Sequence, residues 1–455
     1  MGIGRLRILP EDKVYDTIRK QRQQRSPGRS PGAPGINALV LGGGGREYAI
    51  AWRLARCDSV ATIDVMPGNA GMAIFTRLID IPPTDTQAVQ QHIAASHIDL
   101  AIVGPDELIE AGLGDTLRRA SIAVVGPSRA AGRIEWSKSF AKELMDEAGV
   151  PTASWQRYPD GLAAAAALEG RDGPVVVKAD GLAAGKGVVV ARDREEARVA
   201  LATGSIGSGP VVLEDVLEGE EASLQTLVDG ETVVALPPAR DHKRVGEGDT
   251  GPNTGGMGAY SPTELLPDEQ AQDLANELVA PVAQALVRRG IPYRGVIYAG
   301  LIRTRDGWKV LEYNARFGDP EAQVTLPRLG GDFARLMVAL GEGRLAEHAR
   351  DHPLRFGQRA YVSVALCSEG YPGKTEGGQP IDGLEDLPDG VWAFHAATRR
   401  AGARFLTAGG RVIHVVAGGD SVAEARRLAN LGAERIRWKG RFYRSDIAAQ
   451  EVAVA

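Results

Sequence analysis

A polar, glycine-rich run at residues 241–260, DHKRVGEGDTGPNTGGMGAY, places cationic side chains beside backbone N–H groups that no side chain shields. Asp241, His242, Lys243 and Arg244 lead into six glycines within the next fourteen residues. Glycine lets a bound anion approach the backbone, and consecutive N–H groups beside cations suit phosphate. A run this polar is not expected in a core. It is therefore either a mobile surface loop or one wall of a phosphate site.

A second glycine-rich turn lies between two runs of valine in PVVVKADGLAAGKGVVVA, residues 174–191. Its spacing differs from a Walker P-loop, because only three residues separate Gly181 from Gly185 and because Lys186 precedes glycine instead of Ser or Thr. The pattern predicts a strand, a turn and a second strand. Lys178 ends the first strand and Lys186 lies in the turn, so both could reach one phosphate chain; a surface hairpin is the alternative.

Carboxylates and an amide are grouped in two further runs. In LEDVLEGEEAS, Glu214 closes an apolar strand and Glu221 opens another, so either could accept hydrogen bonds from an adenine amino group or a ribose hydroxyl. In WKVLEYNARFGDPEAQ, Glu312 and Asn314 are two residues apart on an expected strand and share a face. Their hard oxygens suit magnesium held together with substrate phosphates. Arg316 lies on that face if the strand continues.

The elements that must position these residues fall into successive units. Residues 1–36 hold eight Lys or Arg against three acids and end in the linker SPGRSPGAPG, so we expect a basic extension that the chemistry does not need. Residues 37–136 alternate short β-rich runs with helical stretches, which predicts a parallel α/β domain. Residues 137–334 and 335–455 predict α+β domains, with one long helix at 267–289.

The turn after the first expected strand is not a classical dinucleotide fingerprint. The three positions that the fingerprint reserves for glycine hold Gly42, Gly44 and Glu47 here, so the third fails. A helix that begins near Arg46 still presents free N–H groups to a phosphate.

Composition narrows the class of protein. The net charge of -5 gives no general attraction to nucleic acid, and no run reaches the roughly eighteen apolar residues of a membrane span. Cys57 and Cys367 lie far apart without metal-type or redox-type spacing, which fits a reducing cytoplasm. We therefore expect a cytoplasmic protein, a monomer or weak dimer, that binds small molecules and neither nucleic acid nor membrane.

Taken together, the motifs resemble the phosphoribosylamine–glycine ligase family, ATP-grasp enzymes of purine biosynthesis, from about Asn37 to Ile447. The resemblance is carried by GGGGREYAIAW, MPGNAG, SKSFAK, VKADGLAAGKGV, LEGEEAS, DHKRVGEGDTGPNTGGMGAYSP, GVIYAGL, EYNARFGDPEAQ and FYRSDIA. It implies an α/β N-terminal domain, an ATP-grasp domain of two α+β lobes and a small C-terminal α+β domain. The implied reaction activates glycine as an acyl phosphate, which 5-phosphoribosylamine attacks to give glycinamide ribonucleotide, ADP and phosphate.

The resemblance also implies roles for individual residues of this chain. ATP would be held by Lys138, Lys178, Lys186, Glu214, Val216 and Glu221. Magnesium or manganese would be held by Glu312 and Asn314. The substrates would lie among Gly44, Gly45, Gly68, Asn69, Asp241, Lys243, Arg316 and Asp319. The reacting groups would be surrounded by Lys186, Asp241, Lys243, Arg244 and Arg316.

Three segments depart from the family pattern. Tyr48 stands where the family usually has histidine, residues 106–109 lack a proline, and residues 203–210 replace a longer stretch near the lid over ATP. Two alternatives therefore stay open: a related ATP-grasp ligase with another amine or amino acid, and a nucleotide-binding protein without turnover.

Overall fold

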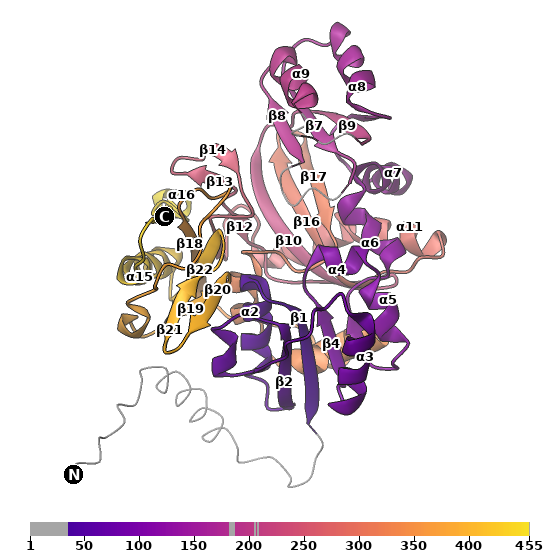
Figure 1. Ribbon diagram of the computed structural model, residues 1–455. Helices are drawn as coiled ribbons and strands as arrows, with labels where there is room; N and C mark the ends of the chain where they lie inside the picture. Colours follow the sequence, from indigo (N-terminus) through magenta and orange to yellow (C-terminus); the bar gives the residue numbers. More distant parts are fainter. Residues whose placement is uncertain (1–34, 182–186, 204–205, 207–208, 455) are drawn as a thin grey trace, which may run out of the picture.

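The computed structural model describes residues 35–181, 187–203, 206 and 209–454 (Figure 1). Its N-terminal domain is a parallel sheet in the order β3-β2-β1-β4-β5. The strands are β1 (Ile36–Gly42), β2 (Val60–Pro67), β3 (Arg77–Leu78), β4 (Leu100–Val103) and β5 (Ala123–Val125). The helices are α2 (Gly45–Leu54), α3 (Thr86–Ala95), α4 (Asp106–Glu110), α5 (Leu113–Arg118) and α6 (Arg129–Trp136). The expected alternation of strand and helix is thus present.

Two α+β lobes follow, the arrangement that the resemblance implied. The lid lobe, drawn at the top of Figure 1, is an antiparallel sheet in the order β6-β9-β7-β8 with two helices on it. Its elements are β6 (Trp155–Tyr158), α8 (Gly161–Ala167), β7 (Val175–Ala179), β8 (Val188–Ala191), α9 (Arg194–Ala202) and β9 (Val211–Asp215). Apolar residues from both helices and the strands form a core of its own.

The second lobe is an antiparallel sheet in the order β11-β10-β16-β17. Its elements are α7 (Lys138–Ala148), β10 (Glu220–Asp229), β11 (Thr232–Ala235), α10 (Ala271–Leu278), α11 (Ala280–Arg288), β16 (Arg294–Thr304) and β17 (Gly307–Asn314). The single helix predicted at 267–289 was wrong, because the chain turns at Val279 and Pro281, which lacks an N–H, opens the second helix.

A bulge in β17 determines which side chains of this strand enter the core and which do not. Gly300 pairs with Glu312 and the next residue, Leu301, pairs with Val310, so Leu311 has no partner in the β16 register. The inserted residue puts Val310 into the same core cluster as Tyr313, although their numbers differ by three. Regular pairing resumes from Glu312 to Asn314, which leaves these two residues on one face.

The glycine-rich run 241–260 is largely β structure. It holds β12 (Arg240–Asp241), β13 (Arg244–Gly246), β14 (Thr250–Asn253) and β15 (Gly258–Ser261). The expectation that the run lies outside the core was wrong for its last part. Met257 and Tyr260 are fully buried in the C-terminal core cluster, since β15, which contains Tyr260 and directly follows Met257, pairs with both β12 and a strand of the C-terminal domain. The run therefore joins the central domain to the C-terminal one.

The C-terminal domain continues that sheet, in the order β12-β15-β18-β22-β19, with α15 on one face (Figure 1). Its elements are β18 (Ala360–Ser368), β19 (Val391–His395), β20 (Thr398–Ala401), β21 (Arg404–Thr407), β22 (Arg411–Gly419), α15 (Val422–Arg435), β23 (Arg441–Phe442) and α16 (Ala449–Val454).

The segment between the two domains packs against the N-terminal sheet. Its helices are α12 (Ala322–Thr325), α13 (Phe333–Glu342) and α14 (Leu345–Asp351). The boundary expected between residues 334 and 335 falls inside α13, whose Leu340 is fully buried in one core cluster with strands β1, β4 and β5.

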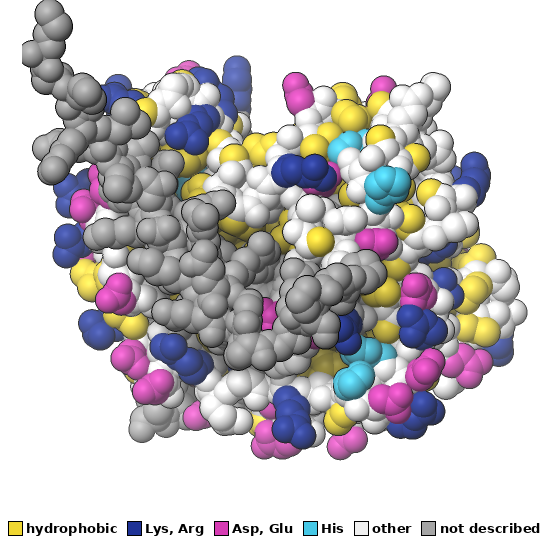
Figure 2. All heavy atoms as spheres, turned by 90° about the horizontal axis from the view of Figure 1, so that it is seen from below, with side chains coloured by type: hydrophobic (Ala, Val, Ile, Leu, Met, Phe, Trp, Pro, Cys, Tyr) yellow, Lys and Arg dark blue, Asp and Glu magenta, His cyan; other side chains and the backbone are white. Residues whose placement is uncertain are grey.

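The outer surface carries both signs of charge. Lys or Arg and Asp or Glu side chains are interspersed over the described part of the face in Figure 2. Among the described residues, no helix has both the length and the apolar character that a membrane crossing requires.

Leu340→Ala should lower the free energy of unfolding by about 2–5 kcal/mol, because it leaves a cavity between α13 and the N-terminal sheet. Leu162→Ala, at a leucine that is 84% exposed on α8, is the matched control and should leave stability nearly unchanged. Thermal unfolding of both variants measures this. Equal shifts would contradict the packing of α13 described above.

Candidate active site

The first part of the site is a pair between α7 and the bulged strand. Lys138 Nζ lies 3.3 Å from Glu312 Oε2 and donates to the Glu135 carbonyl at 2.9 Å. Burial alone would raise the pKa of Glu312, but Lys138, Lys243 and Lys178 hold it well below its usual value. The Glu312 side chain is still 29% exposed. An ionised carboxylate that remains accessible, with Asn314 beside it, suits a hard cation.

The second part is a carboxylate shared by two buried lysines. Lys178 Nζ on β7 and Lys142 Nζ on α7 lie 2.9 and 3.1 Å from the Glu214 carboxylate on β9. Lys178 also donates to the Leu311 carbonyl at 3.1 Å. That carbonyl belongs to the bulge, so Lys178 bridges the lid lobe to the other lobe.

The third part comes from β10 and the start of the glycine-rich run. Lys243 Nζ lies 2.6 Å from Glu221 Oε2, and burial of Lys243 is outweighed by Asp241 and Glu221, which raise its pKa. Burial raises the pKa of Asp241 to about 7, with Lys243 opposing and Glu321 reinforcing the shift. These charges therefore form one electrostatic network that includes Glu321, whose carboxylate accepts from Ser223 Oγ at 3.0 Å.

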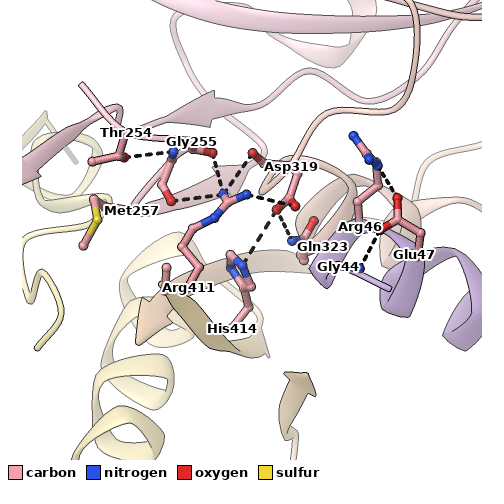
Figure 3. Close-up of polar contacts among 12 residues, drawn as sticks. Gly44, Arg46, Glu47, Thr254, Gly255, Met257, Asp319, Gln323, Arg411 and His414 are labelled. Atoms are coloured by element: carbon pink, nitrogen blue, oxygen red, sulfur yellow. Dashed lines mark hydrogen bonds and ion pairs between the residues drawn. The ribbon is translucent and has the colours of Figure 1, made fainter. Parts of the chain in front are cut away.

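Asp319 joins this network to the C-terminal domain (Figure 3). Its carboxylate lies 3.0 Å from Arg411 Nη2 and accepts from Gln323 Nε2 at 2.8 Å. Burial opposes ionisation of Asp319, but Arg411, His414 and Arg46 hold its pKa well below the usual value. Arg411 also donates to the carbonyls of Gly255 and Gly256. One guanidinium thus fixes both the glycine-rich run and Asp319.

A cavity of about 400 Å³ opens at this junction. It is lined by Gly43, Gly44, Gly45, Asp319, Tyr371, Pro372, Gly373, Thr375, Ala396, Ala397, Gly410 and Arg411. Gly44 is the N-cap of α2, so the positive end of a ten-residue helix faces the space. A Cβ on Gly43 would approach the Gly68 carbonyl to 2.4 Å, so the turn requires glycine there. The Gly44 N–H itself donates to Glu47 Oε2 at 2.7 Å, and Asp319 and Arg411 give the lining both signs of charge, so the cavity suits a small polar ligand.

Several of the predicted site residues contact other parts of the protein in this structure. Asn69 donates its amide to the carbonyls of Gly43 and His395, and therefore holds the glycine turn against the C-terminal domain. Arg316 pairs with Glu135 at 3.0 Å. Arg244 donates to the Gly251 carbonyl within its own hairpin, away from Glu312. Val216 follows β9 directly.

Two expectations lie wholly or partly outside the described residues. Lys186 belongs to the segment 182–186, and the shortened stretch 203–210 is described only in part. The other two departures can be placed. Tyr48 packs against Phe75 and Phe394 at ring-centroid distances of 5.3 and 5.0 Å, outside the cavity lining. Residues 106–109 begin α4, with Leu108 and Ile109 buried.

Three residues that contact the site were not indicated by the sequence motifs. Lys142 follows Lys138 by one helical turn, and this spacing on one helix face was the available signal. Arg411 precedes an apolar strand, and Gln323 follows RFGDPE. Nothing in the sequence around Arg411 distinguishes it from a solvated arginine.

Two α+β lobes that meet at the pairs Lys138–Glu312 and Lys178–Glu214 define the ATP-grasp class of enzyme. Comparison with known proteins agrees. Residues 36–135, 136–322 and 361–450 match the N domain, the ATP-grasp (A) domain and the C domain of phosphoribosylglycinamide synthetase.

Curated relatives span nearly the same length. The chain is 42% identical over 424 residues to a phosphoribosylamine–glycine ligase of Mesorhizobium japonicum, covering 92% of this chain and 99% of that protein. It is also 42% identical to the enzyme of that name from Rhodopirellula baltica, covering 92% and 98%. The chain therefore belongs to the phosphoribosylglycinamide synthetase family.

Solved structures show the same fold. The crystal structure of phosphoribosylamine–glycine ligase from Thermotoga maritima superposes with a TM-score of 0.78 at 31% identity, covering 91% of this chain and all of that one. The biotin carboxylase domain of a Hydrogenobacter thermophilus 2-oxoglutarate carboxylase, at 19% identity and a TM-score of 0.66, shares the fold.

Arg411→Met should lower kcat/KM for the ligand of the 400 Å³ cavity by about 10²-fold, because Asp319 and the glycine-rich run lose their common restraint. The KM for ATP should change little, since the lysines of the cleft are untouched. Steady-state kinetics with each substrate varied in turn measures this. Arg404→Met, at an exposed arginine of β21, is the control. An unchanged kcat/KM in the Arg411 variant would contradict this role.

Proposed function

We propose that this chain is an ATP-dependent ligase that joins glycine to 5-phosphoribosylamine. Glycyl phosphate is the intermediate, and glycinamide ribonucleotide, ADP and phosphate are the products. One observation carries the proposal. The pairs Lys138–Glu312 and Lys178–Glu214 lie where the two lobes meet at the β17 bulge, and Asp319 lines the cavity at the N-terminus of α2. The names of the relatives at 42% identity support the same reaction.

Charge neutralisation is the first task of such a site, since ATP and a carboxylate must meet. Lys138 and Lys178, which contact Glu312 and Glu214, would turn to the phosphates, and Lys186 is expected to join them. Because the nucleophile is the glycine carboxylate itself, no protein nucleophile is required. Lid closure would exclude water from the acyl phosphate, which hydrolyses readily.

The residues present fit a hard divalent cation. Among the described residues, no group of three His, Cys, Asp or Glu is arranged to hold a metal ion. Glu312 and Asn314 would supply two ligands to magnesium, or manganese, and substrate phosphates and water would supply the others. The ion would neutralise charge on the phosphates during transfer.

The amine would occupy the 400 Å³ cavity. Its phosphate would lie at the N-terminus of α2 beside Gly44 and Gly45, and the ionised Asp319 would accept hydrogen bonds from the amine or the ribose. Arg316, Asp241 and Lys243 do not line this cavity and would lie near the reacting groups instead. A cytoplasmic location and a monomer or weak dimer stay predictions from the sequence.

The direct test is ADP release in the presence of magnesium, with phosphoribosylamine generated in the assay and glycine either present or omitted. We expect release that requires both glycine and the sugar amine. Release that requires glycine but ignores the sugar amine would favour a related ligase with another amine. Tight ATP binding without release under either condition would refute the proposal.

Glu312→Ala should reduce turnover by about 10²-fold or more, because it removes a ligand of the divalent cation. The loss should be greatest at limiting magnesium. Glu231→Ala, at an exposed glutamate in the turn between β10 and β11 of the same sheet, should leave the rate unchanged. Equal rates for the Glu312 variant and wild type at limiting magnesium would remove Glu312 from this role.

A further inference from the structure

Lys142 is a buried cation that the proposed reaction does not use directly. It lies one turn after Lys138 on α7, yet its side chain is only 2% exposed, against 15% for Lys138. Burial lowers the pKa of Lys142 to about 8, with Glu214 opposing and Lys178 reinforcing the shift. Lys142 therefore still carries its proton at neutral pH. A buried charge is unfavourable unless it is paired and hydrogen-bonded, so the partners of Lys142 should indicate its role.

The partners of Lys142 form a closed ring of hydrogen bonds. Lys142 Nζ donates to Thr152 Oγ1 at 2.6 Å, and Thr152 donates to the Val310 carbonyl at 2.6 Å. The next carbonyl, that of Leu311, accepts from Lys178, and Lys178 contacts Glu214. Glu214 returns to Lys142 at 3.1 Å. The ring connects the segment before β6, the β17 bulge and two strands of the lid lobe.

The ring holds two ammonium groups and one carboxylate. Glu214 is 3% exposed, so an unpaired charge on it would be strongly unfavourable. Lys178 is one of the lysines that would contact ATP under the proposed function, and it must loosen from Glu214 to do so. It can leave Glu214 without exposing an unpaired buried charge only if a second cation stays behind. Lys142 is that cation, because its other partner is a neutral hydroxyl and its side chain is enclosed.

We propose that Lys142 is a positioning residue for the nucleotide phosphates. It keeps Glu214 neutralised and in place while Lys178 exchanges that carboxylate for phosphate. The inference rests on the proposed function, since it assumes that ATP enters this cleft. Without Lys142, Lys178 is the only counter-ion left to Glu214 within the described part of the chain, and phosphate must compete with a buried carboxylate for it.

The test separates the phosphate contribution to binding from the rest of the nucleotide. Calorimetry gives the dissociation constants of ADP and of adenosine, and the adenosine constant divided by the ADP constant reports what the phosphates add. In Lys142→Met this ratio should fall at least tenfold, because adenosine lacks the phosphates that must compete with Glu214 for Lys178. Lys309→Met, on the same lobe in β17, should leave the ratio unchanged.

A double variant tests the mechanism of the loss. Lys142→Met combined with Glu214→Gln removes the carboxylate that would retain Lys178, so the ratio should recover by several-fold. Equal losses of ADP and adenosine affinity in Lys142→Met would show a packing role and overturn the proposal. An unchanged ratio, or no recovery in the double variant, would overturn it as well. Failure of the wild type to bind ADP would instead refute the proposed function.

The wild-type protein provides the same test if the variants do not fold. Lys142 faces Glu214, Lys178 and Asp146, and its pKa of about 8 lies below that of an ordinary lysine. Raising the pH from 7 to 9 removes its proton, so the ratio of the two dissociation constants should fall over that interval. A ratio that is constant from pH 7 to 9 would contradict the proposal.

Discussion

The bulge at Leu311 is the local feature on which the site depends. In an unbroken β17 strand, Val310 would share a face with Glu312, so either an apolar residue would enter the cleft or the carboxylate would enter the core. The inserted residue resolves this conflict, since Val310 and Tyr313 pack in one core cluster while Glu312 meets Lys138. It also leaves the Leu311 carbonyl free of the β16 ladder, where Lys178 uses it.

Charge balance then explains why several domains meet here. Among the described residues, three cations that the proposed reaction would use have an anionic partner: Lys138 has Glu312, Lys178 has Glu214, and Lys243 has Glu221. These pairs keep like charges close together without substrates and can be exchanged for phosphate or carboxylate when substrates arrive. Asp319, held by Arg411 from β22, extends the same balance to the cavity at α2.

Much of this site could be predicted from local sequence, because its residues lie in short motifs. The two-residue spacing of Glu312 and Asn314 gave their common face, and Lys178 was expected at the end of a strand. The bulge was not predictable, since it depends on pairing with β16. Lys142 and Arg411 were missed because burial and distant partners, which only the tertiary structure supplies, distinguish them from solvated cations. The core position of Tyr260 depends likewise on β18.

In the proposed reaction, the γ-phosphoryl group of ATP is transferred to the glycine carboxylate before the amine attacks. Glycine labelled with oxygen-18 in its carboxylate tests this most directly. Transfer of the γ-phosphoryl group to that carboxylate, followed by amide formation, leaves one carboxylate oxygen in the released phosphate. The account predicts one labelled oxygen per phosphate in each turnover, measured by mass spectrometry. Unlabelled phosphate accompanying full amide formation would contradict it.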